Sequence, residues 1–292
     1  MISKNTAWAT FGPTSLFVLI WSSGALFSKL GLQHASPFAF LGLRFALALS
    51  VLLALGLAGR RWLPAPGTRL HVALTGLLMI GSYSICHLLA LDHGLTPGVL
   101  ATVLGVQPIL TLALTERQAF SRRRLAGLGL ALGGLVLVVY ESIARAHFTA
   151  TGILFAFGAL ACMTLGAILQ KSVKQAPRDV LPLQLACSLL LCLLFAPFQP
   201  MAVDLSTGFW VALVWMGVVM SVVATLLLYR LIHAGNLVNV TSLFYLVPAG
   251  TAALDYLVLG NRLAPWSLAG MLAILLGLMQ VFRSSAQRAT AR

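Results

Sequence analysis

The sequence predicts an all-α integral membrane protein with ten transmembrane helices, arranged as two inverted five-helix repeats. Three observations lead to this fold class. Of the 292 residues, 60% are hydrophobic and 9% are charged, far below the roughly 25% charged residues of a soluble domain. The apolar residues form ten segments long enough to cross a bilayer. Short motifs from the first half of the chain recur in the second half.

Each expected helix is an apolar run bounded by glycine, proline or basic residues. Taking about 20 apolar residues per crossing, we expect helices at residues 12–31, 37–58, 70–91, 97–115, 125–141, 149–170, 180–198, 207–231, 238–259 and 264–283. The first run is long enough to span and nine more follow it, so it is predicted to be a retained helix and not a cleaved signal. The connections between helices are too short to hold a soluble domain.

The recurring motifs keep a nearly constant spacing, which indicates an internal duplication. The matched residues, first half before second, are Gly24 and Gly166, Lys29 and Lys171, His93 and His233, Pro108 and Pro248, Gly127 and Gly270, and Gly134 and Gly277. Residues 1–145 are therefore predicted to form one repeat, and residues 146–292 a second repeat with a short basic C-terminal tail. Five crossings in each repeat place the second copy upside down in the membrane, an architecture that is usual in alternating-access transporters.

The basic residues predict the orientation of the chain. With a cytoplasmic N-terminus, the cytoplasmic segments hold Lys4, Arg60, Arg61, Arg69, Arg117, Arg122, Arg123, Arg124, Lys171, Lys174, Arg178, Arg230, Arg283, Arg288 and Arg292. Only Arg145 and Arg262 then lie outside. Because basic residues concentrate on the cytoplasmic side of membrane proteins, we expect both termini in the cytoplasm.

Other classes of protein fit the sequence less well. The net charge of +13 is spread over short loops between apolar runs, whereas nucleic-acid binding needs a clustered basic face, so no nucleic-acid partner is expected. The four cysteines lie inside apolar segments without metal-type spacing, and are expected to be packing residues. The acidic residues are scattered, so neither a catalytic site, a metal site nor a cofactor is expected.

Several short motifs resemble those of EamA-type transporters of the drug/metabolite transporter superfamily. They are Trp21-Ser22-Ser23-Gly24 with Lys29, Pro37 and Arg44, then Gln107-Pro108, Leu246-Val247-Pro248, and Leu259-Gly260-Asn261-Arg262-Leu263. Asn261 stands where members of that family commonly carry a glutamate. The resemblance covers nearly the whole chain and is strongest to the aromatic amino acid exporters. It implies a ten-helix bundle in the plasma membrane, the bacterial inner membrane, that exports small metabolites.

Polar and aromatic side chains at mid-depth are the candidate substrate-binding residues. Tyr83 and His87 are four residues apart and share one face of the third span. Ser221 and Thr225 do so on the eighth span, where Tyr229 continues the same stripe. Trp21 lies near the middle of the first span, away from the interfaces where tryptophan usually anchors. Such side chains also serve as interhelical hydrogen bonds or core packing, which stays the alternative interpretation.

Tyr245 on the ninth span joins this candidate set, and Arg44 on the second span completes it. An arginine inside a span is costly unless it is paired, hydrated or snorkelling. Pairing with a backbone carbonyl or with Asp255, and contact with an anionic group of the substrate, are both open. Pro108 and Pro248 lie mid-span in equivalent helices, and each is predicted to interrupt its helix as a hinge or as a packing kink.

The favoured function is therefore an alternating-access carrier that exports small metabolites, above all amino acids with apolar or aromatic side chains. Nucleotide sugars, drugs and organic cations are the alternative cargo, and a channel is the alternative class. The expected partners are the small-molecule substrate and the lipid bilayer. The sequence leaves a homodimer and a monomer both open.

Overall fold

The apolar segments fold as helices, because a backbone inside a bilayer must satisfy its own hydrogen bonds. The computed structural model describes residues 4–56, 63–116, 121–144, 149–259 and 264–289. The helices of the first half are α1 (Lys4–Leu32), α2 (Pro37–Gly56), α3 (Arg69–Gly76), η1 (Leu77–Ser82), α4 (Tyr83–Asp92), α5 (Pro97–Leu104), α6 (Gln107–Thr115), α7 (Arg122–Val138) and α8 (Tyr140–Ala144). Asn261, Arg145 and Arg262 lie outside the described residues.

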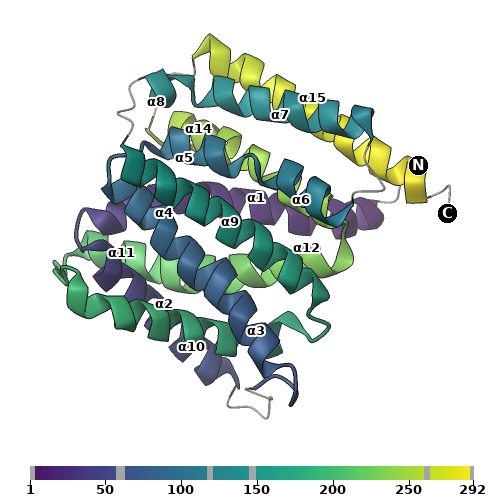
Figure 1. Cartoon of the computed structure of the whole chain (residues 1–292). Helices are drawn as coiled ribbons and strands as arrows, with labels where there is room; N and C mark the ends of the chain where they lie inside the picture. Colours follow the sequence, from purple (N-terminus) through teal and green to yellow (C-terminus); the bar gives the residue numbers. More distant parts are fainter. Residues whose placement is uncertain (1–3, 57–62, 117–120, 145–148, 260–263, 290–292) are drawn as a thin grey trace.

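The second half repeats this order of long and interrupted helices. It contains α9 (Ala150–Ser172), α10 (Pro177–Phe195), η3 (Ala196–Phe198), α11 (Thr207–Val214), η4 (Trp215–Ala224), α12 (Thr225–Ala234), α13 (Leu237–Ser242), η5 (Leu243–Tyr245), α14 (Leu246–Leu259) and α15 (Pro265–Ala289). The helices lie side by side in one bundle, with α10, α2 and α3 on one flank and α7 and α15 on the other (Figure 1).

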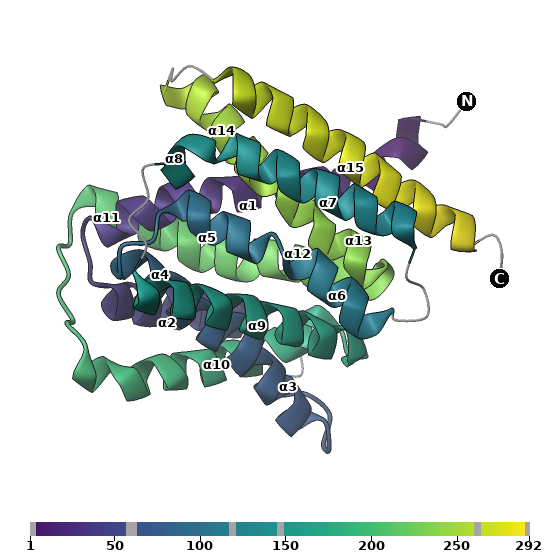
Figure 2. The ribbon, with the colours of Figure 1, turned by 45° about the horizontal axis from the view of Figure 1, so that its top comes forward.

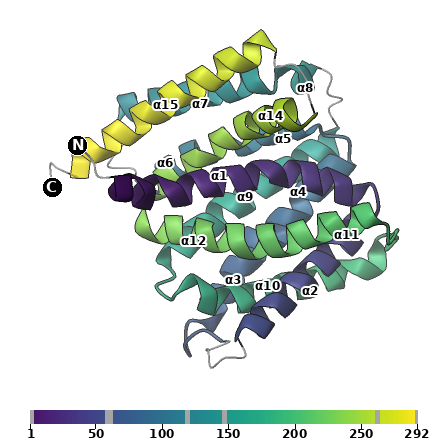
Figure 3. The same ribbon diagram turned by 180° about the vertical axis from the view of Figure 1, so that it is seen from behind.

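Nine of the described helical segments are long and apolar enough to cross a membrane. The fifth expected span falls just below that length, because α7 has 17 residues and its helix is interrupted at Val139 before α8 begins. The chain is thus an all-α multi-pass membrane protein with nine to ten candidate spans. The beginning of α1 and the end of α15 lie at the same end of the bundle (Figure 3), which is the arrangement expected of the ten crossings predicted from the sequence. We call this the terminal end, and the other the far end.

Helices α7 and α15 pack along each other at the edge of the bundle (Figure 2). Glycines bring the two backbones together. A Cβ atom on Gly127 would lie 2.9 Å from the carbonyl oxygen of Gly277, and one on Gly134 would lie 2.6 Å from that of Gly270. The close contact between these small residues therefore lies within one chain.

The same reciprocity occurs near the centre of the bundle. A Cβ atom on Gly24 would lie 2.8 Å from Cε of Met220, and one on Gly166 would lie 2.6 Å from Cβ of Met79. Gly24 and Gly166 are matched residues of the sequence repeat, and Met79 and Met220 occupy π-helical turns in equivalent helices. Each glycine of one half thus receives the methionine of the other half.

Two kinds of irregularity interrupt the central helices. The π-helical segments η1 and η4 lie in the third and eighth spans, and such turns are often found at functional sites. Helix α5 ends at Leu104 and α6 restarts at Gln107, with Pro108 in its first turn. The 3₁₀ turn η5 likewise precedes α14, where Pro248 lies in the first turn. Both helices are therefore interrupted just before the predicted prolines, and hinge motion there stays a prediction.

A buried cation joins the two halves at the terminal end. Arg124, at the start of α7, is 1% exposed. It donates hydrogen bonds to Glu116 Oε2 at 2.5 Å, to Asn236 Oδ1 at 2.6 Å and to Asn239 Oδ1 at 3.2 Å. Asn236 also donates to Glu116 Oε1 at 2.7 Å. Arg124 was expected in a cytoplasmic segment together with Arg122 and Arg123. The structure instead places its side chain in the interior, where it links the end of α6 to the start of α13.

Candidate functional site

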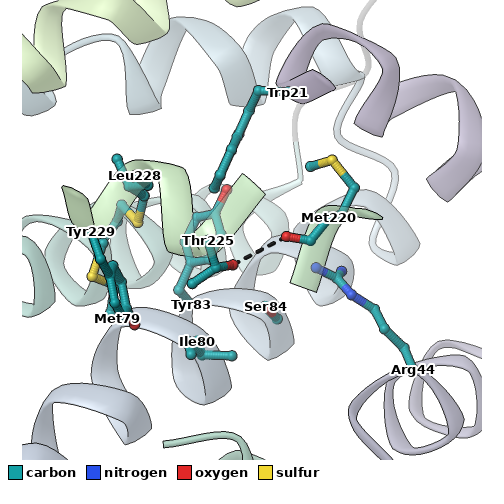
Figure 4. Close-up of a pocket in the computed structure, with 11 residues that line it drawn as sticks. Trp21, Arg44, Met79, Ile80, Tyr83, Ser84, Met220, Thr225, Leu228 and Tyr229 are labelled. Carbon is teal, nitrogen blue, oxygen red and sulfur yellow. Dashed lines mark hydrogen bonds between the residues drawn. The ribbon is translucent and has the colours of Figure 1, made fainter. Parts of the chain in front are cut away.

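Side chains from both halves surround a cavity of about 50 Å³ in the middle of the bundle. They come from α1, α2, η1, α4, α9, η4 and α12, and are Trp21, Arg44, Met79, Ile80, Tyr83, Ser84, Met163, Met220, Thr225, Leu228 and Tyr229. Trp21, Tyr83 and Arg44 point into the same space from three different helices (Figure 4). Four of the predicted substrate-binding residues, Trp21, Arg44, Tyr83 and Thr225, therefore meet at this cavity.

Arg44 brings a positive charge to the cavity wall. Its Nε atom donates a hydrogen bond of 2.7 Å to the hydroxyl of Ser221. Within the described part of the chain, no carboxylate forms an ion pair with Arg44. The side chain of Asp255, the alternative partner considered from the sequence, lies outside what the structure describes. A guanidinium group carries five donors, so further donors remain for an anionic ligand.

The π-helical turn of η4 explains how Ser221 is positioned. Ser221 donates its hydroxyl proton to the Met216 carbonyl at 2.9 Å, and Thr225 donates to the Met220 carbonyl at 3.1 Å, both five residues back along the chain. Because its proton is used in this way, the Ser221 hydroxyl presents an oxygen lone pair to Arg44. Ser221 does not line the cavity itself, but it fixes the cation that does.

Aromatic rings form another part of the cavity wall. Trp21 lies in an aromatic cluster, with its ring centroid 5.0 Å from that of Phe17 and 5.2 Å from that of Phe244. The Tyr83 ring lies 5.6 Å from that of His87. These spacings are typical of favourable aromatic pairs, so the neighbours hold Trp21 and Tyr83 in place.

Besides Ser221, two of the predicted site residues do not line the cavity. His87 lies behind Tyr83, and its buried Nδ1 atom has no hydrogen-bond partner among the described residues. Tyr245 is 1% exposed and packs in a separate hydrophobic cluster with residues such as Leu128 and Ile274, from α7 and α15. The turn η5 carries Tyr245 toward that pair of helices, and sequence spacing alone does not reveal this.

Three methionines that line the cavity were not predicted from the sequence, whereas Tyr229 lies on the predicted stripe of the eighth span. Met79, Met163 and Met220 form much of the wall, and a methionine in an apolar span carries no signal that separates a cavity from a core. Tyr229 is fully buried and donates to Gln184 Oε1 at 2.7 Å, while Gln184 donates to Gln170 at 3.0 Å. This polar chain ties the cavity wall to α10 and α9.

The cavity is small for an organic ligand. Ligand pockets usually enclose about 300–1,000 Å³, whereas a water molecule occupies about 30 Å³. The 50 Å³ present therefore holds one or two waters, and an amino acid needs the walls to move apart. Methionine side chains are flexible and can repack around ligands of different shape.

Comparison with known proteins identifies a family. The chain matches the EamA-like transporter family over residues 14–140 and again over residues 150–283. A probable amino-acid metabolite efflux pump of Salmonella typhimurium (strain LT2) is 26% identical over 280 residues, which cover 90% of this chain and 91% of that protein. Its namesake in Escherichia coli K12 is 26% identical over 54% of this chain and 52% of its own length.

Two further similarities agree with this family. An uncharacterized inner membrane transporter of Escherichia coli K12, YedA, is 27% identical over 45% of this chain and 43% of its own length. A solved structure described as "Crystal structure of protein" gives a TM-score of 0.76 at 20% identity and covers 92% of this chain and 94% of that one. At this identity the likeness shows a shared fold and nothing about the cargo.

Proposed function

Because this chain belongs to the EamA-like transporter family, and is thus a transporter and not an enzyme, we propose that it exports amino acids with apolar or aromatic side chains by alternating access. The names of two similar proteins, both probable amino-acid metabolite efflux pumps, support this class of cargo. The observation that carries the proposal is the cavity lined by both halves, in which one cation faces aromatic and methionine side chains.

The arrangement suits the three parts of such an amino acid. The guanidinium group of Arg44, held by Ser221, offers charge-assisted hydrogen bonds to a carboxylate. The rings of Trp21 and Tyr83 offer stacking surfaces for an aromatic side chain, and also a face for the ammonium group. Methionine walls admit side chains of different size.

Alternating access in this proposal depends on the duplicated halves. The family matches twice, once in each half, and the reciprocal contacts of Gly24 with Met220 and of Gly166 with Met79 favour a two-fold relation between residues 1–145 and 146–292. In a carrier of this type the site lies at the repeat interface, and moving one half against the other exposes it to either side. We place the protein in the bacterial inner membrane, as for the similar transporter YedA, with both termini in the cytoplasm.

The alternative cargoes fit the cavity less well. A nucleotide sugar carries a diphosphate, which calls for several cations, and Arg44 is the one cation among the described lining residues. A drug or organic cation would gain nothing from Arg44. A channel would need a continuous pore lined by charges or carbonyls, whereas the described cavity is a small and local space.

Counterflow in proteoliposomes tests the role of the carboxylate. Proteoliposomes that contain the wild-type protein and are loaded with unlabelled phenylalanine should accumulate labelled phenylalanine. Phenylethylamine, which lacks the carboxylate, should compete poorly for this uptake. In Arg44→Gln the affinity for phenylalanine should fall at least about 30-fold, because one partner of a buried charge pair is lost. Competition by phenylethylamine should be unchanged or improved.

The matched control is Arg230→Gln, which removes an exposed arginine from α12 away from the cavity. It should transport as the wild type does. Failure of every amino acid to compete, with competition by nucleotide sugars or organic cations, would overturn the proposed cargo. An equal loss of affinity for phenylalanine and phenylethylamine in Arg44→Gln would remove Arg44 from carboxylate recognition.

A further inference from the structure

Two lysines occupy matched positions at opposite ends of the bundle. Lys29 lies in the last turn of α1 and Lys171 in the last turn of α9. Each follows a glycine of the repeat, Gly24 or Gly166, at the same spacing. Helix α1 ends at the far end and α9 ends at the terminal end, so the two ammonium groups lie on opposite sides of the cavity.

Lys171 binds the end of another helix at the terminal end. Its Nζ atom donates three hydrogen bonds to the carbonyl oxygens of Ile232, His233 and Gly235, at 2.6, 3.1 and 2.7 Å. The last carbonyls of a helix have no partner within that helix, and a cation is stabilised there by the helix dipole. All three donors of the lysine are thereby used, and α9 is joined to the turn between α12 and α13.

Lys29 makes no equivalent contact. Its side chain is exposed, and it forms no hydrogen bond or ion pair with any residue that the structure describes. The matching helix end is that of α4, because His93 corresponds to His233 in the repeat.

A hollow of about 280 Å³ lies beside that helix end. It is lined by Leu32, Pro37, Leu88, Leu91 and Asp92. Leu32 follows Lys29 within one turn of α1, and Asp92 is the last residue of α4. At the far end, a hollow therefore lies beside the helix end that corresponds to the one bound by Lys171 at the terminal end.

We propose that Lys29 and Lys171 are paired gate residues that close the two ends of the transport pathway in turn. In this structure Lys171 holds the terminal end shut and the far end is open. In the opposite state Lys29 binds the end of α4 and the carboxylate of Asp92, while Lys171 releases the turn after α12. The inference rests on the proposed alternating-access function, and with both termini cytoplasmic the present state faces outward.

Spin-label distances in lipid nanodiscs, measured without substrate, test the gates. The background replaces Cys86, Cys162, Cys187 and Cys192 by alanine. One label pair, at Lys174 and Arg230, reports the terminal end, and a second pair, at Gln33 and His93, reports the far end; all four side chains are exposed. When Lys171 is replaced, the distance distribution of the terminal-end label pair should gain a longer component, and that of the far-end pair should gain a shorter one.

The expected change in the ratio of the two states in Lys171→Gln is about tenfold or more, as for the loss of a hydrogen bond to a charged group. Adding Lys29→Gln to Lys171→Gln should restore the long far-end distance, because the far end can no longer close. Lys171→Met keeps much of the aliphatic stem and should give the same distance distributions as Lys171→Gln. The control is Arg178→Gln, which removes another exposed cation near the terminal end and should leave both distance distributions unchanged.

Unchanged distributions in both Lys171→Gln and Lys171→Met would overturn the proposal. The proposal would also be overturned if the double variant of Lys29→Gln and Lys171→Gln kept the short far-end distance of Lys171→Gln alone. Because these distances are recorded without substrate, the outcome is independent of which molecule is exported. A wrong assignment of the cargo would appear in counterflow and leave the distance changes in place.

Discussion

Replacing Arg124 by alanine is expected to destabilise the folded protein by about 2–3 kcal/mol, at or just below the lower limit of the roughly 3–5 kcal/mol that breaking a buried ion pair costs. Three acceptors lose their donor: the carboxylate of Glu116 and the side-chain oxygens of Asn236 and Asn239. Glu116 and Asn239 are half-buried, and a polar group that is shielded from water and has no partner keeps much of its desolvation cost. Asn236 is exposed and keeps the N–H of Asn239, so its loss is smaller. Because these acceptors come from both halves of the chain, the loss loosens the terminal end of the bundle.

Two features of the structure place the cost below the upper limit of about 5 kcal/mol for such pairs. The side chain of Glu116 is 19% exposed, so water can replace part of the lost interaction. Its other carboxylate oxygen also keeps the hydrogen bond from Asn236. Asn236 caps α13 through the backbone N–H of Asn239, and that bond does not involve Arg124.

Thermal unfolding of the purified protein measures this cost. At about 2–4 °C per kcal/mol, the midpoint of Arg124→Ala should fall by about 5–10 °C. Arg122→Ala is the matched control, since Arg122 begins the same helix and is exposed, and it should stay within about 1–2 °C of the wild type. In the double variant with Glu116→Ala the losses should be less than additive, because the two residues share one interaction.

Unfolding of Arg124→Ala at the temperature of Arg122→Ala would contradict a stabilising role for Arg124. Simple addition of the losses from Arg124→Ala and Glu116→Ala would rule out a shared interaction. Either result would mean that this cluster contributes packing but no coupled electrostatic stabilisation.

Two further predictions concern topology and the cavity. Single-cysteine reporters at Ser3 and at Ala289 should both be protected from membrane-impermeant reagents in sealed cells, and labelling of either would contradict cytoplasmic termini. Trp21→Ala and Tyr83→Phe should each weaken substrate affinity severalfold at normal expression. Trp21→Ala removes a stacking surface that contributes about 0.5–1.5 kcal/mol beyond burial. Tyr83→Phe keeps the ring and removes the hydroxyl, whose hydrogen bond to a ligand would contribute about 0.5–1.5 kcal/mol. Trp266→Ala, an exposed position at the start of α15, should chiefly affect insertion or stability. Normal counterflow affinity in purified Trp21→Ala and Tyr83→Phe would assign both residues to the core.

Much of the fold could be predicted because its signals are local. Apolar runs define the spans, and proline starts α2, α5, α10 and α15 in the structure, as expected where a missing backbone N–H costs nothing. The matched glycines are likewise visible in the sequence, and Gly127 and Gly277 meet in the structure. In the cavity, Trp21, Arg44, Tyr83 and Thr225 could be found because polar and aromatic groups at mid-depth are unusual in a span.

The remaining features depend on long-range contacts or on a fine choice between helix types. Arg124 belongs to a run of three arginines that has the composition of a solvated loop, and its burial depends on Asn236, which is 112 residues away. The π-helical turns cannot be read from their sequences, since the apolar pattern of η4 also suits an α-helix. Tyr245 was expected at the cavity, and the 3₁₀ turn that carries it rotates it toward α7 and α15.

The reciprocal glycine contacts have a consequence for how the two halves can change. An interface is called isologous when the same pair of residues meets twice, each partner supplying one member of each pair, as in a two-fold homodimer. The pairs Gly24 with Met220 and Gly166 with Met79 have this form. Here both copies belong to one polypeptide, so a substitution alters one contact of the two and leaves its counterpart intact. Each half can therefore specialise while the other preserves the join, a freedom that a dimer of identical chains does not have.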